Sequence, residues 1–236
     1  MNQLATALDQ RSAPLDIFFR DDDAGWAMPE LGAMLDLFGR RACPVDLAVI
    51  PASLDHRGAD QLNQWRADHP RIGLHQHGYA HVNHEPAAAR KCEFGRARPV
   101  DRQCADIMIG RDRMAGMLGP TDAIFTPPWN RCTPSLLERL GEMGFAMFSN
   151  DDATTACDGL SSLPITLDWD RARREDRLEA DLAEQLADAN GPVGIMLHHA
   201  TLDDPARATL ADTLDLLAGH DKVVLRSMRH WIGDQG

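Results

Sequence analysis

Short apolar runs rich in β-branched and aromatic residues alternate along the chain with longer segments whose apolar residues recur at helical spacing. The short runs predict strands over 15–19, 45–50, 71–75, 123–126, 144–149, 163–167, 193–197 and 222–226. Helical spacing predicts helices over 29–42, 104–119, 133–144 and 177–190. Such alternation is typical of α/β folds in which βα units surround a parallel sheet or barrel.

The pattern predicts one domain over residues 1–236. A chain of 236 residues is long enough for one large α/β domain with a substantial core, and it contains no repeat of fixed period and no change of composition that would mark a linker. The longest irregular region, about 81–102, is polar and contains two prolines. A loop of that length in a compact domain is usually functional or disordered.

Composition and charge exclude several classes of function. The apolar runs are far shorter than the roughly 20 residues that span a bilayer, so we expect no membrane partner. A net charge of −12 repels phosphate backbones, so we expect no nucleic-acid partner. The N-terminal residues lack the pattern of a secretory signal, and five scattered cysteines suit reduced thiols, so we expect a cytoplasmic protein.

Residues that carry chemistry gather where the predicted strands end. Three aspartates, Asp21 to Asp23, follow the first strand, and the later segments are HQHGYAHVNH at 75–84, TPPWNR at 126–131, DWD at 168–170 and HHA at 198–200. Six of the ten histidines lie in two of these segments: His75, His77, His81, His84, His198 and His199. The carboxyl ends of parallel strands meet on one face of an α/β barrel, and that face holds the active site.

The acid run and the histidines together predict a metal site. Three adjacent carboxylates repel one another unless water screens them or a cation lies among them. His77 and His81 have a spacing that lets two imidazoles bind one ion, and a carboxylate would complete a site with an open position. Alternatively, the histidines are surface groups or hydrogen-bonded side chains. The agreement of five segments on one face favours the metal site.

At these residues the sequence resembles the polysaccharide deacetylases with the NodB-homology fold. The resemblance implies a distorted (β/α) barrel of about seven parallel strands. It also implies an enzyme that hydrolyses N-acetyl or related acyl groups. The family's first motif resembles RDDDAG, with Asp22 in the place of the general base and Asp23 in that of a metal ligand. The second motif, His-x-x-x-His, is similar to HGYAH and implies that His77 and His81 are the other two ligands.

The third motif, Arg-x-Pro-x-Gly, resembles TPPWN only in part. Pro128 and Trp129 match, whereas Thr126 and Asn130 stand at the Arg and Gly positions. The resemblance implies that Pro128, Trp129 and Asn130 line the substrate pocket and that the backbone N–H of Trp129 faces the oxyanion. The motif Arg normally orients the base. Either the base is tuned differently here, or one of two other arginines substitutes: Arg20 or Arg131.

The fourth and fifth motifs match more loosely. LDWD resembles the Asp and Trp that flank the family's pocket, which makes Asp168 and Trp169 candidates. IMLHH resembles Leu-x-x-His, which makes His198 the catalytic acid and places His199 where many members have Asp. The remaining unusual residues are interpreted as packing side chains or an incidental thiol: Trp26, Trp65, Trp231 and Cys92.

These motifs imply a metal-dependent hydrolase of a non-peptide amide bond. A cytoplasmic protein is poorly placed to process cell-wall polymer, so the expected substrate is a small N-acylated amino sugar or related compound. A ureide or cyclic amide, which some cytoplasmic relatives hydrolyse, is also a candidate. Zinc is the first choice for a site of two histidines and one aspartate, and nickel, cobalt or iron would also fit.

The alternative function is a non-catalytic, metal-containing binding or regulatory module on a deacetylase scaffold. The loss of the motif Arg at Thr126 supports that alternative, whereas the presence of both a base and an acid favours an enzyme. A small molecule or carbohydrate is the expected binding partner, and a homo-oligomer is compatible with the sequence.

Overall fold

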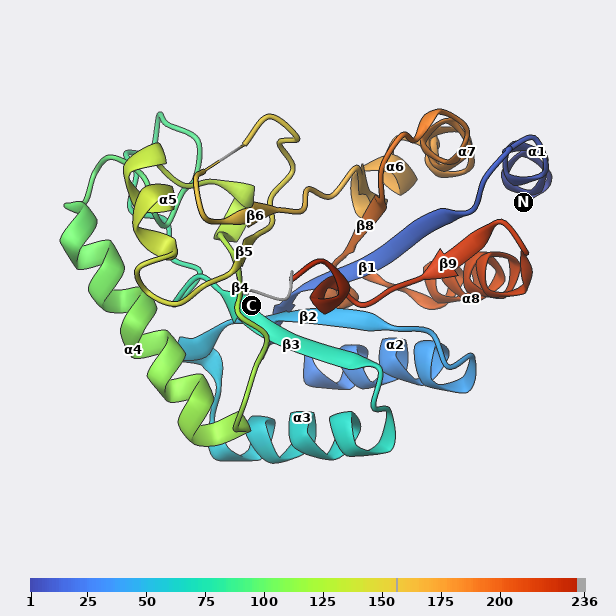
Figure 1. Cartoon of the computed structure of the whole chain (residues 1–236). Coiled ribbons are helices and arrows are strands. Elements are labelled where there is room, and N and C mark those ends of the chain that lie inside the picture. The colour runs from blue at the N-terminus through green and yellow to red at the C-terminus, as the bar shows by residue number, and fades with distance from the viewer. Residues whose placement is uncertain (156, 233–236) are drawn as a thin grey trace.

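Figure 1 shows the computed structural model of the chain, which describes residues 1–155 and 157–232. A curved parallel sheet lies at its centre, with helices packed around the outside. The strands are β1 (Leu15–Ala24), β2 (Val45–Val49), β3 (Ile72–His77), β4 (Ile124–Thr126), β5 (Met147–Phe148), β6 (Ser161–Ser162), β7 (Leu167–Asp168), β8 (Val193–Leu197) and β9 (Val223–Leu225).

The strand order confirms the predicted distorted (β/α) barrel of the NodB type. Neighbouring strands run parallel in the order β6-β5-β4-β3-β2-β1-β8-β7, and β9 pairs with the beginning of β1. The described residues form nine strands, against about seven implied by the resemblance and eight predicted from the apolar runs. The strand without a predicted run is β6, whose two residues, Ser161 and Ser162, are both polar.

The four predicted helices are present as α2 (Met28–Arg40), α4 (Val100–Leu118), α5 (Pro134–Leu140) and α7 (Leu178–Asp188). The structure adds α1 (Asn2–Asp9), α3 (His56–Asp68), α6 (Trp169–Arg174) and α8 (Asp204–Gly219), with short 3₁₀ turns η1 (Pro51–Ser53), η2 (Pro128–Asn130), η3 (His199–Thr201) and η4 (Met228–Trp231). Helix α3 buries only Ala59 and Leu62, so its apolar stripe gives a weak signal. No helix in the described ranges is long and apolar enough to cross a membrane.

The predicted strand at 163–167 is not a continuous strand. The backbone N–H of Leu163 donates to Phe148 O of β5 at 3.0 Å, and that of Thr166 donates to Gly194 O of β8 at 2.8 Å. The segment therefore crosses the open side of the barrel, where the two ends of the sheet, β6 and β7, do not pair with each other. The proline inside it has no N–H to donate, which prevents a regular ladder.

Side-chain alternation along β1 divides the acid run between two faces. Phe19 packs in the core between the sheet and the helices, whereas Phe18 packs in a smaller core inside the barrel. Because successive side chains of a strand point to opposite faces, Arg20 and Asp22 share the inner face with Phe18, and Asp21 points the other way. The acid run was expected to follow the first strand, but it forms the last part of β1.

Candidate metal centre and active site

Asp23, His77 and His81 come together at the carboxyl end of the sheet. Asp23 Oδ1 lies 3.3 Å from Nε2 of His77 and 3.2 Å from Nε2 of His81. The ligand atoms of the three residues all lie within 4.8 Å of one another. Asp23 Oδ1 is buried and accepts no hydrogen bond from the described residues. An unpartnered carboxylate oxygen facing two imidazoles fits a divalent ion, so these donors suit the predicted metal.

Two of these residues have left-handed backbone conformations. The φ angle is 68° at Asp23 and 55° at His81, a region that residues other than glycine rarely adopt. The pairing of β1 with β2 changes register between Asp21 and Ala24, around Asp23. The chain thus leaves the regular strand geometry where it supplies the carboxylate, as is common where a functional site dictates the backbone.

The neighbouring strand β4 fixes the ring of His77. Its Nδ1 lies 3.1 Å from the carbonyl oxygen of Thr126, which can only accept, so Nδ1 carries the hydrogen and the Nε2 lone pair faces Asp23. His75 lies on the same face of β3, two residues earlier, and its Nε2 is 3.0 Å from Thr126 Oγ1. Burial lowers the pKa of His75 to about 3, so this ring is neutral.

Glu93 holds the turn that carries His81. It accepts hydrogen bonds from the backbone N–H groups of Ala80 at 2.7 Å, His81 at 3.2 Å and Tyr79 at 3.3 Å. At Gly78, where φ is +56°, an added Cβ would lie 2.5 Å from Glu93 Oε2, so the turn needs glycine. The irregular region expected at 81–102 thus packs against the backbone of a ligand.

Removing the Glu93 carboxylate is expected to weaken metal binding. Mutating a residue that holds a metal ligand in place typically lowers metal affinity by about 10- to 100-fold. The loss of affinity should be near the lower value in Glu93→Gln and near the upper value in Glu93→Ala. Competition with a chromogenic chelator measures the change. Glu85→Gln is the matched control, because Glu85 accepts a backbone N–H bond from Ala97 in the same loop at 2.9 Å. Equal affinities in the Glu93 and Glu85 variants would contradict the role of Glu93.

Asp22 forms a buried bidentate ion pair with Arg20. Nε of Arg20 lies 2.8 Å from Oδ1 of Asp22, and Nη2 lies 3.0 Å from Oδ2. Burial alone would raise the pKa of Asp22, but the positive charges of Arg20 and His198 and the hydrogen bonds from Arg20 outweigh it and lower the pKa to about 2. Asp22 is therefore an ionised acid beside the three candidate ligands.

Arg20, rather than Arg131, is the arginine that contacts Asp22. Arg20 also donates to Asn130 Oδ1 at 2.7 Å and to Ser149 Oγ at 2.9 Å. Arg131 instead donates to Lys91 O in the long loop at 2.9 Å. Asn130, which was expected to line the pocket, accepts a hydrogen bond from the arginine that holds Asp22.

His198 lies at the end of β8 and forms an ion pair with Asp170. Its Nδ1 is 3.0 Å from Asp170 Oδ2, and Thr201 Oγ1 donates to the other carboxylate oxygen. Burial alone would lower the pKa of His198, but the bond to Asp170 and the charges of Asp22 and Asp23 raise it to about 9. This environment holds the imidazole in its protonated form at neutral pH.

Asp170, not Asp168, supports His198. Asp168 accepts a hydrogen bond from the backbone N–H of Arg171 at 3.0 Å and caps α6. Asp168, Asp170 and His198 also have ligand atoms within 4.8 Å of one another. However, both carboxylates already accept hydrogen bonds, unlike Oδ1 of Asp23, so this group does not show the same need for an ion.

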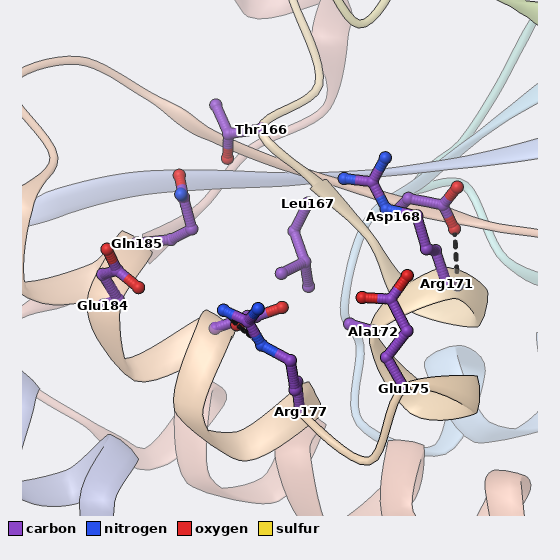
Figure 2. A pocket seen from close by; sticks show the side chains of 10 residues that line it. Thr166, Leu167, Asp168, Arg171, Ala172, Glu175, Arg177, Glu184 and Gln185 are labelled. Atoms are coloured by element: carbon purple, nitrogen blue, oxygen red, sulfur yellow. Dashed lines mark hydrogen bonds and ion pairs between the residues drawn. The ribbon is translucent and has the colours of Figure 1, made fainter.

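A polar cavity of about 310 Å³ lies beside α6 and α7, as Figure 2 shows. Its lining includes Asp168 and the ion pair between Arg177 and Asp181, whose Nη2 to Oδ1 distance is 2.7 Å. None of the three candidate metal ligands lines this cavity. The cavity is therefore separate from the centre formed by Asp23, His77 and His81.

Of the tryptophans named in the sequence analysis, Trp169 lies away from its expected place, whereas Trp129 and Trp26 contact His81. Trp169, expected at the pocket wall, is fully buried in the core between the sheet and the helices, so its side chain does not form that wall. Trp129 lies with its ring centroid 4.3 Å from that of His81, and Pro128 packs against the turn at Gly78. Trp26, expected to be a packing residue, also contacts His81, with ring centroids 5.0 Å apart.

Three positioning residues were missed by sequence reasoning: Glu93, Asp170 and Asp21, the partner of His199. Each is a buried acid. Each forms a hydrogen bond with a residue of the site that lies on another element or far away in the sequence. Among them, Asp170 had a usable signal, since it belongs to the DWD segment. Nothing local marks Glu93, whose partners are backbone N–H groups.

The chain matches no family model and no curated protein sequence. Its fold is similar to a candidate polysaccharide deacetylase from Mycobacterium smegmatis, with TM-score 0.70, 17% identity and coverage of 94% of this chain and 90% of that one. A family 4 carbohydrate esterase from Streptomyces lividans, solved with acetate, has a TM-score of 0.59 and 13% identity, with coverage of 92% of this chain and 93% of that one. A family 4 pseudoenzyme from Bacillus anthracis has a TM-score of 0.64 and 11% identity, with coverage of 94% of this chain and 66% of that one. The fold is therefore that of the polysaccharide deacetylases, and its activity must be argued from the site.

Proposed function

We propose that the protein is a metal-dependent hydrolase that removes an acyl group from the nitrogen of a small N-acylated amino sugar or related compound. The observation that carries the proposal is one cluster in which a metal-ligand set adjoins an ionised base and a protonated acid. The ligand set is Asp23, His77 and His81, the base is Asp22 and the acid is His198.

The donor set suits one divalent ion. Two imidazole nitrogens and one carboxylate would leave a coordination position for water or substrate. Zinc is the first choice, and nickel, cobalt and iron also suit these ligands. When bound, the ion would polarise the acyl carbonyl and make a water molecule more acidic.

The protein's own groups divide the proton transfers. Asp22 would accept a proton from the attacking water, and Arg20 keeps that carboxylate ionised and correctly turned. His198 would donate a proton to the departing amine, because Asp170 keeps its ring protonated. With pKa values of about 2 for Asp22 and about 9 for His198, both groups are in the required form at neutral pH.

The surrounding segments support a small substrate. The loop after β3 is tied to the site through Glu93, and Cys92 Sγ lies 3.3 Å from Arg131 O, directly after η2. These contacts place the loop against two segments of the site, so we propose that it narrows the mouth. The backbone N–H of Trp129 in η2 would face the oxyanion.

Metal analysis tests the ligand assignment. The purified protein is expected to hold about one divalent ion per chain, and His77→Ala or His81→Ala should sharply lower occupancy while the circular-dichroism spectrum stays unchanged. His84→Ala is the matched control, because His84 lies in the same loop and is hydrogen-bonded to Arg98. Unchanged occupancy in both ligand variants would contradict the site.

A substrate panel tests the activity. The zinc-loaded protein should be assayed with N-acetylated hexosamines, their oligomers, ureides and cyclic amides, by release of acid or amine. Turnover of a monomeric amide above its rate on oligomers supports the proposal. Preference for oligomers would instead indicate a polymer deacetylase.

A non-catalytic metal-binding module is the second candidate. A pseudoenzyme shares this fold, and Thr126 stands where the motif arginine belongs. Arg20 reduces the weight of the second observation, because it supplies the missing interaction with Asp22. Full metal loading with no turnover across the panel would favour this module.

A further inference from the structure

Trp26 exposes a large apolar surface beside a centre of charged groups. The side chain is 41% exposed, and its ring stands edge-on to His81, with centroids 5.0 Å apart. Trp129 contacts His81 as well, at 4.3 Å. We call Trp26 and Trp129, which both contact His81, the apolar rim.

An apolar rim around a polar centre is suited to a ligand that has both kinds of surface. Exposed indole and aliphatic groups are costly to hydrate, and contiguous exposed apolar side chains on soluble proteins commonly mark binding sites. In small-molecule sites the polar groups fix orientation, while apolar walls supply most of the contact. The rim is next to His81, so a ligand whose amide reaches the candidate metal centre would place its neighbouring atoms against Trp26.

The backbone of Trp26 is fixed by a buried pair that the proposed mechanism does not use. The Trp26 carbonyl lies 2.9 Å from Nε2 of His199. A carbonyl can only accept, so Nε2 carries a hydrogen and donates it. Nδ1 of His199 lies 2.7 Å from Oδ2 of Asp21, and the backbone N–H of His199 donates to Oδ1 at 2.9 Å.

This pair is better explained as a positioning device than as a source of stability. Asp21 and His199 are both fully buried, and removing two ionisable groups from water offsets much of their attraction. Their bonds connect β1 and η3 to the turn around Trp26. That turn is strained, since φ is 42° at Ala27, so it needs an external contact to hold it.

We propose that Trp26 is a specificity-determining residue that contacts the apolar part of the substrate, and that the Asp21–His199 pair positions it. The inference rests on the proposed function, because it assumes that an amide reaches the metal centre. It names the substrate class further: the amide must carry a saturated ring or chain large enough to cover the indole of Trp26.

Binding of two simple amides tests the contact without requiring turnover. N-cyclohexylacetamide and N-methylacetamide carry the same acetamide group and differ in the apolar substituent. The zinc-loaded protein should bind the cyclohexyl compound about tenfold more tightly, which corresponds to about 1.4 kcal/mol and to a ring covered on one face. In Trp26→Ala that ratio should fall below about threefold, and Trp26→Phe should retain most of it.

Fluorine NMR supplies the readout for each indole. The five tryptophans, labelled with 5-fluorotryptophan, give separate signals that single Trp→Phe changes can assign. The Trp26 signal should shift on saturation with the cyclohexyl amide, while that of Trp65, which packs against Gly32 on α2, should not. An unchanged binding ratio in Trp26→Ala, or a stationary Trp26 signal, would overturn the proposed contact.

His199→Gln tests the positioning role. In the free protein the Trp26 signal should move or broaden and the amide ratio should fall, with zinc content unchanged. If this variant does not fold, Asp21→Asn combined with His199→Gln keeps hydrogen-bonding groups and removes the buried charges. A Trp26 signal identical to wild type in either folded variant would refute the positioning role. Absence of turnover with a preserved amide ratio would count against the proposed hydrolysis alone.

Discussion

Replacing Asp22 with Asn is expected to reduce turnover of an active amide substrate by a factor on the order of 10² to 10⁴, the usual contribution of a positioned general base. In the wild type, Arg20 pairs with both oxygens of Asp22. The Asn side chain has nearly the same shape and can still accept one of these two bonds. It cannot take a proton from water. Metal content, measured by atomic emission on the same samples, should stay near that of the wild type.

Asp23→Asn provides the contrast, because Asp23 is a candidate ligand and its variant should lose both metal and turnover. Asp151→Asn, in an exposed loop, shows the effect of losing one negative charge elsewhere. If Asp22→Asn loses as much metal as Asp23→Asn, the division between base and ligand is wrong.

The different roles of neighbouring aspartates follow from strand geometry that the sequence partly reveals. Alternation places Asp22 on the face of Arg20 and Asp21 on the face toward His199. Asp23 leaves the alternation because its φ is 68°. The apolar pattern of β1 predicts the strand, but no local signal predicts that it continues through three acids. That continuation needs the buried partners on distant segments.

The gathering of Asp23, His77 and His81 at one place was predictable, because it depends on short spacing and on the order of the strands. His77 and His81 are four residues apart, and Asp23 ends a strand that lies two places from β3 in the sheet. The arginine that contacts Asp22 was harder to predict. Arg20 comes from β1 rather than β4 and is held by Asn130, 110 positions away in the chain. Contacts at such separation are set by packing of the whole sheet, so the sequence left Arg20 and Arg131 as alternatives.

The positions of Trp169 and Trp26 show what sequence motifs do not specify. A motif gives residue types and order, whereas the direction of a side chain depends on where an element begins. Helix α6 starts at Trp169, which turns the indole into the core and leaves Asp170 to meet His198. Trp26 faces outward because the chain turns sharply after Asp23. Neither feature follows from apolar periodicity, which does not give the direction of an individual indole.

His198→Ala is expected to lower turnover by a factor on the order of 10² to 10⁴, since the departing amine would then leave without a proton donor. The imidazole works in its protonated form, so activity should fall as pH rises through its pKa, which is about 9. The pH dependence of kcat/KM should therefore have an upper limb that depends on this residue. Because a bound cation offsets the charge of Asp23, variants must be compared at equal metal content.

Asp170→Asn gives the sharper test of the same assignment. Losing the carboxylate beside Nδ1 removes a charge that favours the imidazolium, so the pKa of His198 should fall and the upper limb should move to lower pH by about one to three units. Thr201→Val is the matched control, because it removes a hydrogen bond to Asp170 but keeps the carboxylate. In Thr201→Val the upper limb of the kcat/KM profile should move by less than about half a pH unit. An upper limb that stays in place in Asp170→Asn would show that His198 is not the acid whose ionisation limits the rate.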